Sequence, residues 1–265
     1  MRRVVFNQKG GVGKSTIACN LAAASANAGA RVLVVDLDTQ GNSTQYLLGK
    51  PGRDLEPTLA GFFEQVLSVP LRPKRPDEFV HGTLFERLDV MPSHPFLAQQ
   101  QDKLESRYKI FKLREALAEL DKQYDFIYID TPPALNFFTR SALIATDCCL
   151  IPFDCDNFSR RALYTLLEDI AEIRADHNAG LVIEGIVVNQ FLRRARLPQR
   201  MVQELIAEGL PILEPYLSSS VKVRESHECA KPLVYLAPKH KLTQEFIALH
   251  SVLEERRQGE QRLRA

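Results

Sequence analysis

A glycine-rich segment near the start of the chain carries the residue types best suited to bind phosphate. It follows a short apolar run and precedes a helical pattern, which is the context that a phosphate-binding loop requires. Glycines let backbone N–H groups approach phosphate oxygens, and the positive end of the helix dipole favours an anion there. We expect Lys14 to reach the β- and γ-phosphates of a nucleotide and the Ser15 hydroxyl to ligate Mg²⁺. The predicted phosphate-binding residues are Lys9, Gly10, Gly11, Val12, Gly13, Lys14, Ser15 and Thr16.

Three aspartates lie at or just beyond the ends of apolar runs. Asp36 and Asp38 close the run at residues 31–36, and Asp130 closes the run at residues 126–130. A carboxylate at the end of a buried strand is costly unless it meets a partner, and hydrated Mg²⁺ is a suitable partner because it takes few carboxylates. We therefore expect Asp130 to hold Mg²⁺ through water, with a strand-end or capping role as the alternative. Asp36 and Asp38 point the same way if the strand geometry continues, and a purely structural role is the alternative for Asp36.

The glycine-rich loop departs from the general phosphate-loop pattern in two ways. That pattern places a glycine five residues before Gly13, where this chain has Gln8, and the chain adds a second lysine, Lys9. With these features, residues 7–16 resemble the deviant Walker A loop of the ParA/MinD family of P-loop ATPases. Further segments that resemble the family are residues 34–42 (its switch I), residues 126–133 (its Walker B strand and switch II) and, more weakly, Asn189 and residues 218–226.

The resemblance implies ATP and Mg²⁺ as cofactors and a weak intrinsic ATPase activity. Lys9 matches a lysine that reaches across a two-fold interface to the partner's phosphates, so hydrolysis would require an ATP-sandwiched homodimer. Asp38 matches the carboxylate that orients the attacking water, and Asp36 lies nearer the metal and the loop. Asn189 matches an asparagine that hydrogen-bonds adenine. A solvated loop lysine and an ordinary strand-end asparagine are the alternatives for Lys9 and Asn189.

Basic residues gather in two segments of the C-terminal half. The first segment, residues 190–200, contains no acid, and the second lies in the sequence SSSVKVRES. By resemblance, such residues bind DNA without sequence preference in the ATP-bound dimer, since phosphate contacts carry affinity but no sequence information. A solvated basic face is the alternative. The predicted DNA-binding residues are Arg193, Arg194, Arg196, Arg200, Lys222 and Arg224.

The resemblance therefore predicts an ATPase that positions or partitions a DNA or protein cargo and is released when a ParB-like or other partner stimulates hydrolysis. A MinD-like spatial or flagellar-number regulator that acts through protein contacts is the alternative. A metallochaperone would need an interface cysteine pair that we do not find. The tail after Leu253 is charged, so we expect no membrane anchor and a cytoplasmic, nucleoid-associated protein of the small type without an N-terminal helix-turn-helix.

The rest of the sequence must supply a scaffold for these residues. The chain has 265 residues, 45% hydrophobic and 25% charged, with 34 basic against 33 acidic residues, which excludes a disordered, collagen-like or disulfide-rich protein. Short apolar runs alternate with helical patterns, which predicts one α/β domain over residues 1–265 with a doubly wound, mostly parallel sheet and helices on both faces. The predicted strands are residues 4–6, 31–36, 88–91, 126–130, 148–153, 181–189 and, at an edge, 211–213. The predicted helices include residues 15–28, 113–122, 162–174, 197–208 and 242–257.

Two expectations concern less regular parts of the chain. Residues 50–79 are rich in proline and glycine and predict a surface excursion, and residues 52–87 are a candidate for partner specificity. The five cysteines contain no CxxC pair, which favours small residues buried in or near the core.

Overall fold

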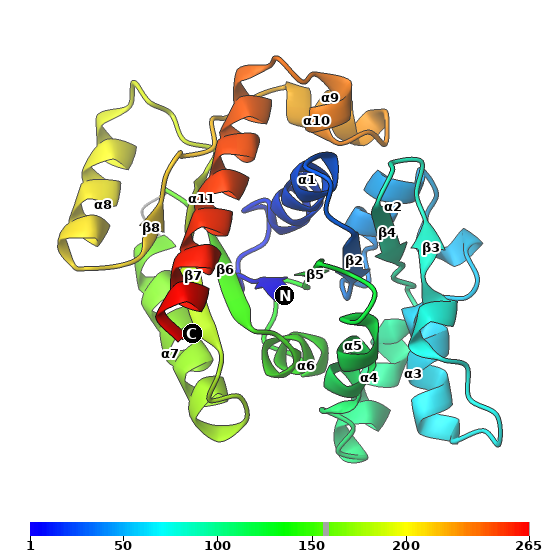
Figure 1. The fold of residues 1–265 in the computed structure, drawn as a ribbon. Helices are drawn as coiled ribbons and strands as arrows, with labels where there is room; N and C mark the ends of the chain where they lie inside the picture. Colours follow the sequence, from blue (N-terminus) through cyan, green and yellow to red (C-terminus); the bar gives the residue numbers. More distant parts are fainter. Residues whose placement is uncertain (156–158, 265) are drawn as a thin grey trace.

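The computed structural model describes residues 1–155 and 159–264, and these form an eight-stranded sheet (Figure 1). The strand order is β3-β4-β2-β5-β1-β6-β7-β8, and every pairing is parallel except that of the edge strand β3 with β4. The doubly wound, mostly parallel sheet is therefore confirmed. The strands are β1 (Arg2–Val5), β2 (Val32–Asp36), β3 (His81–Gly82), β4 (Leu88–Met91), β5 (Phe126–Asp130), β6 (Cys148–Asp154), β7 (Val182–Asn189) and β8 (Ile212–Leu213).

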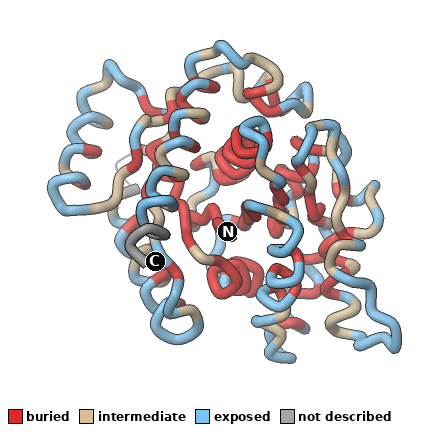
Figure 2. Tube along the Cα trace, viewed as in Figure 1, coloured by how far each residue is buried: buried red, intermediate tan, exposed pale blue. Residues whose placement is uncertain are grey.

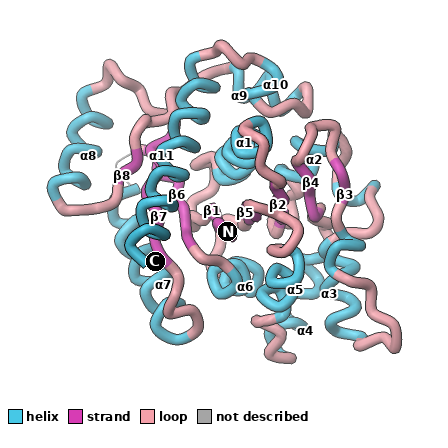
Figure 3. The backbone as a smooth tube through the Cα atoms, in the orientation of Figure 1, coloured by secondary structure: helices cyan, strands magenta, loops and turns pink. Residues whose placement is uncertain are grey.

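Helices cover both faces of the sheet (Figures 1 and 3). Helices α1, α2, α10 and α11 pack on one face, and α3 to α7 pack on the other. The helices are α1 (Lys14–Asn27), α2 (Asn42–Leu48), α3 (Leu59–Ser68), α4 (Leu97–Ser106), α5 (Lys112–Leu120), α6 (Phe137–Ala145), α7 (Ser159–Asp176), α8 (Arg196–Ala207), α9 (Lys222–Glu228), α10 (Leu233–Leu236) and α11 (Lys241–Arg264). In the part of the chain that the structure describes, none of them is long and apolar enough to cross a bilayer.

The sheet separates two apolar cores, which Figure 2 shows as buried segments above and below the strands. Strand β2 illustrates the division, because all five of its residues are buried. Leu33 and Val35 join the core under α3 to α7, whereas Val32 and Val34 join the core under α1 and α11. Alternation of side chains along a strand explains why the central strands are apolar throughout.

The segment at residues 50–79 differs from the expected surface excursion. It contains α3, whose Leu59, Phe62 and Phe63 are buried in the core. Their spacing places them on one helix face, but the proline and glycine on either side hide this short pattern in the composition. The loop that follows α3, including Leu71, is exposed, and so are Arg53 and Asp54 before the helix. The cysteine expectation also fails at one position, since Cys229 is exposed while the other four cysteines are buried.

The fold brings the carboxyl ends of β1, β2 and β5 together. Asp36 at the end of β2 is the register partner of Asp130 at the end of β5, and Asp130 also pairs with Val5 of β1. The glycine-rich loop leaves β1 at this edge. Ligands of doubly wound sheets bind beyond the carboxyl ends of the strands, so the predicted chemistry and the topology indicate the same place.

Candidate nucleotide-binding site

The phosphate loop joins β1 to α1 and is held open by its own backbone. Gly11 and Gly13 have positive φ angles of 78° and 90°, which side-chain-bearing residues rarely adopt. The Lys9 backbone N–H donates to Asn7 Oδ1 at 2.9 Å, and Asn7 Nδ2 donates to Pro152 O of β6 at 2.7 Å. The loop is thereby anchored to the neighbouring strand, with the first turn of α1 directly behind it.

Lys14 turns back over this loop toward the carboxylates. Its Nζ donates to the Lys9 carbonyl at 3.1 Å, and the residue is only 7% exposed. Burial lowers the pKa of Lys14, and the nearby charges of Asp130 and Asp38 oppose that effect. A buried ammonium with one described hydrogen bond retains two N–H groups for phosphate oxygens. This geometry agrees with the predicted role of Lys14.

Asp130 lacks a partner for one of its two carboxylate oxygens. Oδ2 accepts a 2.7 Å hydrogen bond from Ser43 Oγ, whereas Oδ1 is buried without a hydrogen-bond partner. Burial raises the pKa of Asp130 to about 6, although the nearby hydroxyl groups of Ser15 and Ser43 act against this shift. A buried acceptor left unsatisfied is costly, so the position calls for a ligand with positive charge or protons.

Mg²⁺ fits this donor set. Asp130 and the Ser15 hydroxyl are hard oxygen donors, and Mg²⁺ takes one or two such protein groups together with waters and phosphate oxygens. Within residues 1–155 and 159–264, no group of three or more His, Cys, Asp and Glu side chains is arranged to hold a metal alone. The site therefore suits a cation that arrives with a phosphate ligand.

Asp36 is engaged by the protein itself. Its Oδ2 accepts from the backbone N–H and the hydroxyl of Thr44, both at 2.7 Å, and its Oδ1 accepts from the Asp38 N–H at 3.2 Å. Burial raises the pKa of Asp36, and the neighbouring charge of Asp130 adds to this effect. These contacts give Asp36 the structural role of fixing the start of α2, and its contact with nucleotide stays a prediction.

Asp38 lies one residue beyond Leu37 at the mouth of the site and is 6% exposed. Its Oδ1 accepts from the Gln40 N–H at 3.0 Å, and its backbone carbonyl accepts from Ser93 Oγ at 2.5 Å. The described hydrogen bonds use only one carboxylate oxygen, so Oδ2 remains for a water. The catalytic role of Asp38 stays a prediction with a compatible geometry.

Asn189 braces the loop from the end of β7. Its Nδ2 donates to Val12 O at 2.9 Å, and the adjacent Gln190 Nε2 donates to Gly11 O at 3.1 Å. A Cβ atom at Gly13 would come within 2.3 Å of Asn189 Nδ2, so only glycine fits there. Sequence reasoning missed this bracing role, because it joins residues 177 positions apart. The adenine contact of Asn189 stays a prediction.

Sequence reasoning also missed the hydroxyl residues of α2. Ser43 holds Asp130, and Thr44 holds Asp36 while its Oγ1 accepts from the Ser93 N–H at 2.9 Å. A search for the partners that buried aspartates require would have found this Ser-Thr pair directly after Asn42.

The predicted DNA-binding residues lie in two segments that share one anchor. Glu245 of α11 accepts from Arg193 at 3.2 Å and from the Ser218 N–H at 2.8 Å, which places the loop before α8 beside the segment leading to α9. Three of the six basic side chains form ion pairs: Arg193 with Glu245, Arg200 with Glu204 and Lys222 with Glu225. The other three have no ion pair among the described residues and are exposed: Arg194, Arg196 and Arg224.

Comparison with known proteins agrees with this geometry. The AAA domain family model matches residues 3–183. The chromosome partitioning protein ParA of Myxococcus xanthus is 34% identical over 95% of this chain and 87% of its own length. The sporulation initiation inhibitor protein Soj of Bacillus subtilis is 30% identical over 92% of this chain and 94% of its own length.

A solved structure shares the fold over nearly the whole chain. The cobyrinic acid a,c-diamide synthase of Mycobacterium smegmatis, solved with an ATP analogue and magnesium, is 26% identical with a TM-score of 0.82. The match covers 95% of this chain and 93% of that protein. Together with the deviant phosphate loop and the three strand-end aspartates, these findings show that the chain belongs to the ParA/MinD family of P-loop ATPases.

Proposed function

We propose that this protein binds Mg²⁺–ATP at the phosphate loop, dimerises around it and hydrolyses it slowly. The observation that carries the proposal is a buried Lys14 ammonium close enough to feel the charge of Asp130, whose Oδ1 is buried without a hydrogen-bond partner. Lys14 and the loop amides bind the phosphates, Ser15 and Asp130 hold the cation, and Asp38 orients water. Lys9 acts from the second subunit and stabilises the charge that develops on the transferred phosphate.

We further propose that the ATP state binds DNA without sequence preference and so associates with the nucleoid. Arg194, Arg196 and Arg224 supply the first contacts, since their charges have no described ion pair. A partner of the ParB type, or another activator, stimulates hydrolysis and releases the protein from DNA. The similarity to a chromosome partitioning protein and to a sporulation initiation inhibitor supports a role in positioning a large cargo.

A spatial regulator that acts through protein contacts is the second candidate. It is favoured by the ion pairs of Arg193, Arg200 and Lys222, which neutralise three of the six predicted DNA-binding residues. Surface charges already paired with acids attract DNA phosphates less strongly.

The test is retention of purified protein on random-sequence DNA with ATP, ADP or no nucleotide, repeated over a salt series. We expect binding that requires ATP and falls steeply with salt, because each phosphate contact releases a counterion. The variant Arg196→Glu should weaken retention, while Arg75→Glu, a change in the exposed basic loop after α3, serves as the matched control. Intact ATP-dependent dimers that never bind DNA would support the second candidate instead.

A further inference from the structure

A hydrogen bond links the phosphate loop's helix to the helix that carries two predicted DNA contacts. Thr16 lies in the first turn of α1, and its Oγ1 is 3.0 Å from His227 Nε2. His227 belongs to α9, the seven-residue helix that begins at Lys222 and includes Arg224. The link therefore joins residues 211 positions apart in the sequence. It connects the helix behind the phosphate loop to the helix that carries Lys222 and Arg224.

The other side of the His227 ring contacts the second helix of the site. The ring stacks on Tyr46 of α2 with centroids 3.9 Å apart and planes inclined by 16°. The Tyr46 hydroxyl lies 2.8 Å from Ser226 Oγ of α9 and accepts from Asn20 Nδ2 of α1 at 3.2 Å. The inner face of α9 is thus held by α1 and α2 together.

Both supporting helices hold groups of the nucleotide site. Thr16 lies two residues beyond Lys14, and α2 places Ser43 on Asp130 and Thr44 on Asp36. A displacement of either helix when phosphate and Mg²⁺ bind would reach α9 through the Thr16 hydrogen bond or the Tyr46 ring. Packed interfaces of this kind shift between discrete arrangements and do not deform continuously.

We propose that His227 is a positioning residue that couples nucleotide binding at the phosphate loop to the DNA affinity of Lys222 and Arg224. The proposal rests on the DNA binding proposed above and assigns the route by which nucleotide controls it. In this role His227 acts through its contacts with Thr16 and Tyr46 and not as a ligand of nucleotide or DNA. It orients α9, so its loss should reduce the response of DNA binding to ATP and leave the basic side chains in place.

The chain offers a matched control for this link. Ser25, farther along α1, makes a similar contact, 3.2 Å from Ser25 Oγ to His250 Nδ1 of α11. His250 is buried and His227 is partly buried, and both bridge α1 to the C-terminal part of the chain. His250 contacts neither α9 nor the phosphate loop in the described hydrogen bonds, so it shares the chemistry without the proposed role.

The experiment compares DNA affinity with a nonhydrolysable ATP analogue plus Mg²⁺ against affinity with ADP, using a labelled random-sequence duplex. His227→Phe retains the stacking on Tyr46 and loses the hydrogen bond, His227→Gln retains a hydrogen-bonding group, and His250→Phe is the control. We expect His227→Phe to lower the ratio of the two affinities by about fivefold or more, which is the lower range of typical couplings. His227→Gln should restore part of the ratio, and His250→Phe should match the unmodified protein. By reciprocity, DNA should raise the affinity for the ATP analogue in the unmodified protein more than in His227→Phe.

Several outcomes would overturn the proposal, and they differ from failure of the proposed function. An unchanged ratio in His227→Phe, with ATP-dependent DNA binding intact, would overturn the coupling alone. Loss of the ATP-induced dimer in this variant, measured by sedimentation, would show that His227 acts on assembly and would also overturn it. Nucleotide-independent DNA binding by the unmodified protein would overturn both proposals. If His227→Phe fails to fold, hydrogen exchange of the unmodified protein decides: α9 amides that do not respond to nucleotide contradict the coupling.

Discussion

Two buried charge clusters lie at opposite ends of the central strands and satisfy their charges to different degrees. At the amino end, Arg3 is fully buried, and its guanidinium binds Glu184 through Nε and Nη2, both at 2.8 Å. Arg3 also donates to the Tyr128 hydroxyl at 3.1 Å and to Glu254 at 3.3 Å. At the carboxyl end, by contrast, Asp130 keeps a buried oxygen without a partner. The first cluster is complete within the protein, whereas the second requires a ligand.

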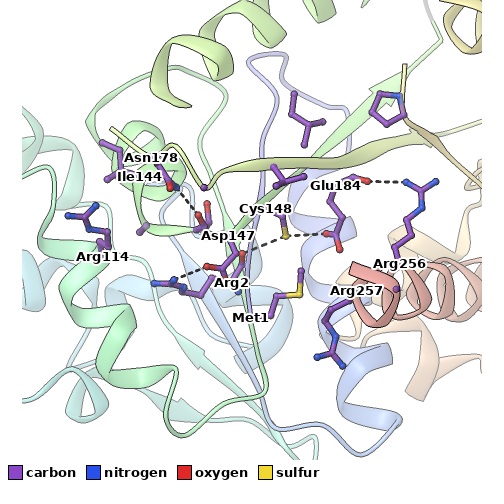
Figure 4. Close-up of a pocket in the computed structure, with 17 residues that line it drawn as sticks. Met1, Arg2, Arg114, Ile144, Asp147, Cys148, Asn178, Glu184, Arg256 and Arg257 are labelled. Atoms are coloured by element: carbon purple, nitrogen blue, oxygen red, sulfur yellow. Dashed lines mark hydrogen bonds and ion pairs between the residues drawn. The ribbon is translucent and has the colours of Figure 1, made fainter. Parts of the chain in front are cut away.

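An open cavity, taken alone, would have indicated the opposite end of the strands. A cavity of about 870 Å³ lies at the amino end, beside Arg2, Cys148 and Glu184 (Figure 4). Arg2 binds Asp147 at 2.7 Å and Arg256 donates to the Glu184 carbonyl at 3.2 Å, although Arg2 Nε is buried without an acceptor. The comparison teaches that an unsatisfied buried anion indicates the functional end better than an open volume does.

The largest effect on stability should come from the complete cluster. Replacing the arginine in Arg3→Met leaves Glu184 buried without its cation, which should cost about 3–5 kcal/mol of unfolding free energy. Urea unfolding monitored by circular dichroism measures this loss. The double variant Arg3→Met with Glu184→Leu should recover most of it, because apolar residues can replace a buried ion pair. A single variant as stable as the unmodified protein would contradict the assignment of this cluster as structural.

In the incomplete cluster around Asp130, a substitution should reduce nucleotide binding and not stability. Lys14→Met should lower nucleotide affinity about a hundredfold, or about 3 kcal/mol, because charge-assisted hydrogen bonds to phosphate are lost. The free energy of unfolding without nucleotide should not fall, since burial already lowers the pKa of this ammonium. Titration with a fluorescent ATP analogue measures the affinity, and Lys112→Met, at a partly exposed lysine of α5, is the control. A Lys14→Met variant that binds nucleotide as tightly as the unmodified protein would contradict the assignment of the carboxyl end as the ligand-binding end.

A substitution of Asp38 should separate ATP binding from ATP turnover. Asp38→Ala should still bind ATP and form the dimer, but turnover should fall about a hundredfold, the lower range for a residue that acts on a proton in the transition state. Phosphate release measured at saturating ATP tests this, with sedimentation to verify the dimer. Full turnover in the variant would remove Asp38 from the catalytic role and leave Asp130 and Lys14 to explain the site.

The parts of the molecule that sequence predicts well are those set by short-range patterns. The spacing of Gly11, Gly13 and Lys14 predicts the loop, and the apolar runs predict the central strands within one or two residues. The Arg3–Glu184 pair and the Asn189 brace join residues 181 and 177 positions apart, so no local pattern reveals them. Helix α3 was missed for another reason, because its short apolar face lies among residues typical of loops.

The smallest effect concerns the pH dependence of the complete cluster. His250 lies 3.2 Å from Ser25 Oγ, which in turn contacts the Tyr128 hydroxyl at 2.9 Å, and burial lowers the pKa of His250 in the folded protein. Near pH 6.5 and below, the unfolded chain therefore binds a proton that the folded chain does not. The contribution of His250 to the free energy of unfolding is fully present above pH 6.5 and is lost as the pH falls below it. Unfolding free energies measured between pH 7.5 and about 5 should therefore decline less in His250→Phe than in the unmodified protein. His227, whose pKa burial also lowers, contributes a decline of the same sign that this variant retains. Parallel curves for the two proteins would mean that His250 binds a proton as readily in the folded state as in the unfolded state. The amino-end cluster would then tolerate an added positive charge, contrary to what its burial and hydrogen bonds indicate.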